Sequence, residues 1–186
     1  MINHDHKCIF IHIPKTGGTS IAKALDITRN HKLGKELKKE YNSYWNDYTT
    51  FSVVRNPWDR MVSLYFYYKK NNEIINLHIK NDIPSTFSNF IHEFNEKRRR
   101  WYTTFYQHQA NWVYDDEENL LVDYVCRFEN LNKDVGEIFN KIGINKTLSH
   151  ERKSVHEHYK TYYNEETIEI VRNLFEKDII LFDYEY

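Results

Sequence analysis

The chain has 186 residues, of which 40% are hydrophobic and 28% charged, and its formal net charge is −1. This length predicts one domain with an apolar core, and the near-neutral charge argues against a nucleic-acid partner. Cys8 and Cys126 lie in separate apolar runs, which favours buried reduced thiols over a disulfide or a metal pair. Because we find neither a secretory-signal pattern nor an apolar run of about 20 residues, we expect a soluble, cytoplasmic protein without a transmembrane segment.

The first informative segment is a strand pattern over residues 8–13 that leads into Lys15, Gly17 and Gly18, with a helix predicted over 19–25. Glycines permit a tight turn, so backbone N–H groups can point at an anion, and the lysine adds a positive charge. The lysine precedes the glycines, which is the reverse of the Walker A order. The segment therefore predicts a phosphate or sulfate site and disfavours a nucleotide triphosphatase or kinase.

A second strand over residues 50–54 ends on Arg55, and a helix over 57–69 follows. The Asn-Pro pair at its start is well suited to an N-cap and a first helical turn. Arg55 should therefore project from the same edge of the sheet as Lys15. A guanidinium group can hold a phosphate by two hydrogen bonds, and the hydroxyl of Ser63, two turns along the helix, could complete that contact.

Two further helices have clear apolar faces. One follows a strand near 120–127, with Asn130 as its expected cap and Gly143 at its end; its apolar face consists of Leu131, Val135, Ile138, Phe139 and Ile142. The other starts after Ser85 and carries an aromatic face of Phe87, Phe90, Ile91 and Phe94, which we expect to pack onto the sheet.

The alternation of strands and helices predicts an α/β fold: a single domain, residues 1–186, with a central, mainly parallel sheet flanked by helices. In such folds ligands bind at the carboxyl ends of the strands, where both anion motifs fall. Residues 28–49 and 98–119 are the least regular in pattern, and we expect them to form the acceptor-binding surface.

Together these segments resemble the sulfotransferases that use 3′-phosphoadenosine-5′-phosphosulfate (PAPS). The resemblance is closest to the carbohydrate branch, similar to heparan 2-O- and 6-O-sulfotransferases, which has an Ile-Pro-Lys-Thr-Gly-Gly-Thr-Ser loop. It extends through residues 122–131, 148–154 and 162–184. It implies the P-loop-like sulfotransferase fold, in a version without a Golgi anchor.

The resemblance also implies which residues bind the sulfate donor. The 5′-phosphosulfate would be held by the phosphosulfate loop, residues 15–20, which consists of Lys15, Thr16, Gly17, Gly18, Thr19 and Ser20. The 3′-phosphate would be bound by Arg55 and Ser63. A polar segment containing Arg152, Lys153 and Ser154 would lie against the nucleotide.

The implied reaction is in-line transfer of a sulfuryl group from PAPS to a carbohydrate hydroxyl, with release of adenosine 3′,5′-bisphosphate (PAP). Lys15 would stabilise the charge that develops on the leaving group. A sugar hydroxyl is not ionised at neutral pH, so a base is needed, and His31 matches the location of a histidine in the resembled enzymes. Glu36 and Glu40 are weaker substitutes for it.

Two alternatives remain open at this point. The acceptor could instead be a small alcohol, a lipid or a protein tyrosine, because variable loops determine it. The chain could also be a non-catalytic nucleotide-binding module that keeps the anion site but lacks a base. The spacings of the ten histidines match no standard zinc pattern, so we expect no metal ion.

Overall fold

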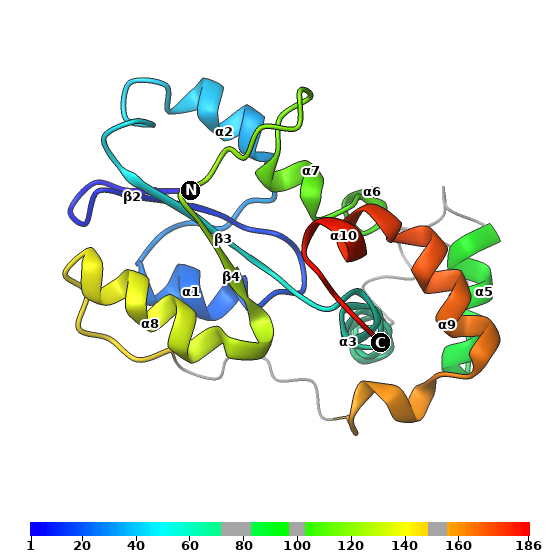
Figure 1. Ribbon diagram of the computed structural model, residues 1–186. Coiled ribbons are helices and arrows are strands. Elements are labelled where there is room, and N and C mark those ends of the chain that lie inside the picture. The colour runs from blue at the N-terminus through cyan, green and yellow to red at the C-terminus, as the bar shows by residue number, and fades with distance from the viewer. Residues whose placement is uncertain (72–82, 97–102, 149–155) are drawn as a thin grey trace. The chain divides into compact units, whose positions relative to one another are not determined.

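The computed structural model describes residues 1–71, 83–96, 103–148 and 156–186 of the chain. Its α/β fold class is as predicted, with a mostly parallel four-stranded sheet flanked by helices (Figure 1). By their contacts the residues form two compact units. The first unit comprises Met1–Arg55 and Gln109–Arg152, and the second comprises Asn56–His108 and Lys153–Tyr186. That both units belong to one domain stays a prediction.

The sheet lies in the first unit and has the strand order β1-β2-β3-β4. The strands are β1 (Ile2–Asn3), β2 (Cys8–Ile11), β3 (Thr49–Val54) and β4 (Tyr124–Arg127). The two-residue strand β1 runs antiparallel to β2, whereas β2, β3 and β4 are parallel to one another. The carboxyl ends of these three strands therefore meet at one edge, as the βα alternation predicted.

Helices cover both faces of this sheet, which explains why every residue of β2 is buried. Helices α1 (Gly18–Ala24) and α8 (Leu131–Lys141) lie on one face, and α2 (Gly34–Glu40) and α7 (Ala110–Val113) lie on the other (Figure 1). The sequence predicted the first pair. The second pair is formed by short segments that no strong apolar periodicity marks.

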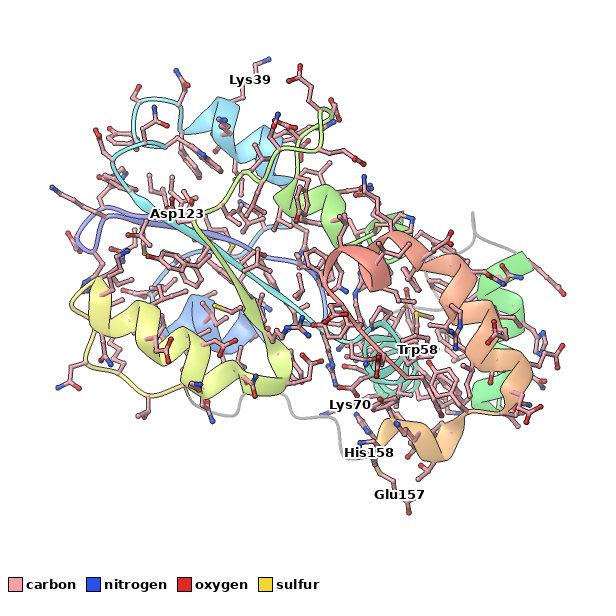
Figure 2. The ribbon with its side chains drawn as sticks, viewed as in Figure 1. Lys39, Trp58, Lys70, Asp123, Glu157 and His158 are labelled. Carbon is pink, nitrogen blue, oxygen red and sulfur yellow. The ribbon has the colours of Figure 1, made fainter. Side chains whose placement is uncertain are left out.

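The side chain of Asp123 fixes the register of β3 and β4. Its Oδ2 accepts hydrogen bonds from the backbone N–H and the hydroxyl of Thr50, at 2.8 and 2.9 Å. The backbone N–H of Asp123 donates to the Thr50 carbonyl at 3.0 Å. Figure 2 shows Asp123 just before β4 begins, so the strand is shorter than the predicted 120–127. This register pairs Val54 with Arg127 at the carboxyl edge.

The start of α8 differs from the sequence prediction. A 3₁₀ turn, η2 (Phe128–Asn130), precedes the helix, and the side chain of Asn130 makes no capping hydrogen bond. Asp134 in the first turn instead accepts a hydrogen bond from the backbone N–H of Arg127 at 2.8 Å. The end of the helix is as predicted, because Gly143 adopts φ 73°, a left-handed conformation that favours glycine.

The second unit is helical. Its elements are α3 (Pro57–Lys70), α5 (Phe87–Glu96), α6 (Thr103–Tyr106), η3 (Tyr159–Tyr162), α9 (Glu165–Leu174) and α10 (Glu176–Leu181). Asn56 caps α3 as predicted, since its side chain accepts from the N–H groups of Trp58 and Asp59 at 3.0 and 3.4 Å. Trp58 is buried among the helices of this unit (Figure 2).

An aromatic core of Tyr65, Tyr68, Phe87, Phe90 and Phe94 fills this unit. The predicted apolar face of α5 is correct, but its predicted packing partner is wrong. Helix α5 contacts α9 and α3. Its four buried side chains belong to one apolar cluster with residues of those helices, and that cluster contains no strand residue. Periodicity identifies which face of a helix is buried, but it does not identify what covers that face.

Candidate active site

The candidate site lies where the three parallel strands of the first unit end. The segment that follows β2 contains Lys15, Arg55 directly follows β3, and Phe128 directly follows β4. The Nη1 atom of Arg55 lies 3.0 Å from the carbonyl oxygen of Lys15. The sheet thus brings the two predicted anion motifs to one edge.

The backbone of the phosphosulfate loop turns through two left-handed residues, Lys15 at φ 71° and Gly17 at φ 81°. The hydroxyl of Thr16 between them is buried and donates to the Ile13 carbonyl at 2.8 Å. Gly17 then caps α1. The first N–H groups of a helix have no carbonyl partner within the helix. A backbone that alternates between right-handed and left-handed conformations also points successive N–H groups to one side, so this segment suits an anion.

Both glycines of the loop are also required by packing. A Cβ atom on Gly17 would lie 2.9 Å from Leu131 Cδ2, and one on Gly18 would lie 2.0 Å from His12 Cδ2. The first contact joins the loop to α8, and the second places the His12 ring against the start of α1. Any larger residue at position 18 would therefore displace His12.

Arg55 is held by a residue that the sequence analysis missed. The backbone N–H of Arg55 donates to Gln109 Oε1 at 2.9 Å, and Gln109 Nε2 donates to the Arg55 carbonyl at 2.8 Å. The amide of Gln109, which is fully buried, thus pairs with Arg55 as a neighbouring strand would. No sequence signal marks this role, because a single glutamine in an irregular segment fits no motif.

His31, the predicted base, lies beside the segment between β2 and α1. Its Nδ1 is 3.2 Å from the carbonyl oxygen of His12, and the two imidazole centroids are 4.4 Å apart. A carbonyl only accepts hydrogen bonds, so Nδ1 carries the hydrogen and Nε2 of the neutral ring keeps a lone pair. Partial burial lowers the pKa of His31, and the charge of Arg29 acts in the same direction, against the opposing effect of the His12 carbonyl. The ring is therefore neutral at pH 7.

His12 is a second histidine at this position, and only 5% of it is exposed. Burial lowers its pKa to about 3, and repulsion from His31 and Arg29 adds to this effect. Among the described residues its Nδ1 has no hydrogen-bond partner. The His12 ring is therefore uncharged at neutral pH.

Thr19, Glu36 and Glu40 are further predicted residues of the first unit, and each accepts a hydrogen bond from a nearby donor. Arg29 donates from Nη1 to the hydroxyl of Thr19 at 3.0 Å, which places a further cation at the loop. Glu36 accepts from the backbone N–H of Leu33 at 2.6 Å, and Glu40 pairs with Lys32 at 2.6 Å. Both carboxylates are therefore engaged elsewhere, which makes them poorer candidates for a base than His31.

The other predicted contacts are not resolved by this geometry. Ser20, the last residue of the phosphosulfate loop, is buried in α1. Ser63 is buried in α3 of the second unit, so a shared 3′-phosphate site with Arg55 stays a prediction. Arg152, Lys153 and Ser154 lie outside the described residues. Within the described ranges no three His, Cys, Asp or Glu side chains gather as a metal site. No described helix is long and apolar enough to cross a membrane.

Comparison with known proteins identifies relatives of this chain. A protein of Archaeoglobus fulgidus, described as uncharacterized, is 26% identical over 129 residues, which cover 63% of this chain and 81% of the relative. The crystal structure of mouse sulfotransferase SULT7A1 complexed with PAP superposes with a TM-score of 0.61 at 16% identity, covering 94% of this chain and 84% of the mouse chain. That similarity establishes the sulfotransferase fold.

The sequence also matches the profile of the Sulfotransferase family over residues 1–185, which is nearly its whole length. The profile does not single out the carbohydrate branch. The match covers nearly the whole chain, and the strand order and the loop between β2 and α1 are consistent with it. The chain belongs to the Sulfotransferase family.

Proposed function

We propose that the protein transfers the sulfuryl group of PAPS to a hydroxyl group of a carbohydrate and releases PAP. The observation that carries this proposal is the phosphosulfate loop with its left-handed residues Lys15 and Gly17, in a member of the Sulfotransferase family. Arg55 donates to the Lys15 carbonyl of this loop, and His31 contacts the carbonyl of His12, which precedes the loop. The loop combines backbone amides with a cation, which is the donor set that a phosphosulfate needs.

Each residue of the site has a distinct part in this proposal. The amides of residues 15–20 bind the 5′-phosphosulfate, and Lys15 stabilises the negative charge that develops on the leaving group. Arg55 and Ser63 bind the 3′-phosphate, and residues 152–154 lie against the nucleotide. The solved structure of the mouse relative, which is complexed with PAP, supports the choice of nucleotide.

His31 is the base in this proposal. Its Nδ1–H donates to the His12 carbonyl, so Nε2 is the atom that accepts the proton of the acceptor hydroxyl. Since its pKa is lowered, the ring stays neutral and able to accept a proton at neutral pH.

The carbohydrate acceptor rests on the resemblance of the loop sequence. The alternatives are the same chemistry on a small alcohol, a lipid or a protein tyrosine, and a non-catalytic nucleotide-binding module. An enzyme is favoured over the module because the Nδ1–H of His31 donates to the His12 carbonyl, which leaves the Nε2 lone pair to accept a proton.

The direct test is transfer of radiolabelled sulfate from PAPS to a panel of glycosaminoglycans, phenols, small alcohols, lipids and tyrosine peptides. We expect a carbohydrate to be labelled, and Lys15→Ala to lower turnover by about 10²–10³-fold with little change in PAP affinity. Lys133→Ala, an exposed lysine on α8, is the matched control and should be unaffected. Labelling of another acceptor class would correct the substrate, and labelling of none would favour the binding module.

A further inference from the structure

Arg55 directly follows β3, and the identity of its ligand rests on the proposed function. Arg55 is only 6% exposed, although arginine is among the residues that are almost never fully buried without a partner. Its backbone is held at both polar atoms by the Gln109 amide, at 2.9 and 2.8 Å. The side chain therefore starts from a fixed point at the end of β3.

The guanidinium group of Arg55 is then oriented by Phe128. Its central carbon lies 4.0 Å from the centroid of the Phe128 ring, a distance typical of a cation–π contact. The same ring faces the phosphosulfate loop, since a Cβ atom on Gly17 would lie 3.3 Å from Phe128 Cε2. Phe128 thus packs against both the arginine and the loop.

From this position Arg55 donates from Nη1 to the carbonyl oxygen of Lys15 at 3.0 Å. Lys15 holds φ 71°, which a residue with a Cβ atom rarely adopts without support from its surroundings. The peptide group between Lys15 and Thr16 is planar and trans, so its N–H points opposite to its carbonyl. By fixing the Lys15 carbonyl, Arg55 also fixes the direction of the Thr16 amide.

We propose that Arg55 is a positioning residue for the phosphosulfate loop: through the Lys15 carbonyl and the Phe128 ring it maintains the loop conformation that binds the 5′-phosphosulfate. A guanidinium group has five N–H donors, so one side chain is able to bind a carbonyl and a phosphate together. Arg55 then links the recognition of the 3′-phosphate to the geometry around Lys15.

The test compares two nucleotides by calorimetry, PAP and adenosine 5′-phosphosulfate, the second of which lacks a 3′-phosphate. If Arg55 positions the loop, Arg55→Lys weakens binding of adenosine 5′-phosphosulfate by about 5- to 20-fold, because lysine cannot reproduce the planar contact with both groups. Phe128→Leu should act in the same direction, by about two- to fivefold. Arg172→Lys, an exposed arginine on α9, is the control and should change neither affinity.

An Arg55→Lys protein that binds PAP more weakly but adenosine 5′-phosphosulfate as well as the wild type would overturn the inference, since Arg55 would then act on the 3′-phosphate alone. A wild-type protein that binds neither PAP nor adenosine 5′-phosphosulfate would refute the proposed function instead. Amide hydrogen exchange without ligand then decides the role of Arg55. We expect residues 15–20 to exchange about tenfold faster in Arg55→Lys, and an unchanged rate would contradict the inference.

Discussion

The phosphosulfate loop of the first unit and the aromatic core of the second unit differ in how their residues are held. In the loop, Lys15 has a left-handed backbone and Gly18 lies against the ring of His12, which precedes the loop. The Nδ1 atom of His12 is buried and has no partner among the described residues. In the aromatic core, the Phe90 ring lies 5.3 Å from Tyr65 and 5.7 Å from Phe94, and it is fully buried.

The two regions therefore differ in what they contribute: the aromatic core contributes stability, and the loop contributes the candidate site. The core buries large apolar rings, which is the main favourable contribution to folding. The loop contains a left-handed lysine and packs against a buried histidine, and features of this kind concentrate at binding and catalytic sites. Substitutions in each region and the pH dependence of stability test this comparison.

The largest effect is expected in the aromatic core. Phe90→Ala removes a fully buried ring and should lower the free energy of unfolding by about 3–5 kcal/mol, because it leaves a cavity among aromatic neighbours. Ile180→Ala on α10, where the side chain is 69% exposed, should change it by less than about 0.5 kcal/mol. Denaturant titration measures both, and a similar small effect for both variants would contradict the account of the core.

The next effect tests the close packing at the loop. Gly18→Ala introduces a Cβ atom 2.0 Å from His12 Cδ2, and we expect a loss of about 1–3 kcal/mol in the free energy of unfolding. The matched control is Gly136→Ala on α8, where a Cβ atom meets nothing within 4 Å. That change should stabilise the protein by about 0.5–1 kcal/mol, because alanine favours a helix. A neutral Gly18→Ala would show that His12 is free to move.

The sequence predicts those features of the structure that depend on residues close together in the chain. The loop, the helix start at Asn56 and the end of α8 at Gly143 follow from local rules of turn and cap geometry, and the structure confirms each element. The carboxyl-edge location of Lys15 and Arg55 follows from parallel strand order.

The parts that the sequence does not predict depend on contacts between distant residues. Gln109 meets Arg55 across 54 positions, and nothing near either residue indicates the pair. The apolar stripe of α5 packs against helices instead of the sheet, since hydrophobic periodicity carries no information about the partner. The arrangement of His12 against Gly18 likewise requires the folded loop.

The pH dependence of stability tests the burial of His12. Its pKa is about 3 in the folded protein and about 6.5 when unfolded, so below pH 6.5 only the unfolded chain gains this proton. The free energy of unfolding should therefore fall with decreasing pH, by about 1.4 kcal/mol per pH unit from this residue, until pH 3.

His12→Asn removes that titration while His31 and the carboxylates remain. Subtracting the pH profile of this variant from that of the wild type isolates the contribution of His12. Parallel profiles between pH 6 and 4 would mean that the His12 ring takes up a proton in the folded protein as readily as in the unfolded chain.

The smallest effect concerns the backbone at Lys15. Lys15→Gly should be about 1 kcal/mol more stable than Lys15→Ala, because glycine adopts φ 71° without the clash that a Cβ atom causes. Both variants lack the ammonium group, so their difference in unfolding free energy reports the backbone alone. Equal stabilities would indicate that residue 15 leaves the left-handed conformation when its side chain is removed.

The measurement that tests the central claim most directly is thermal unfolding with PAP, beside ATP with magnesium and beside inorganic sulfate. A ligand at about 100 times its dissociation constant adds roughly 2.7 kcal/mol, which for a chain of this length raises the midpoint by about 5–11 °C. The account predicts such a shift with PAP and a much smaller one with ATP or sulfate. No shift with PAP, or a larger one with ATP and magnesium, would contradict the assignment of the loop as a phosphosulfate site.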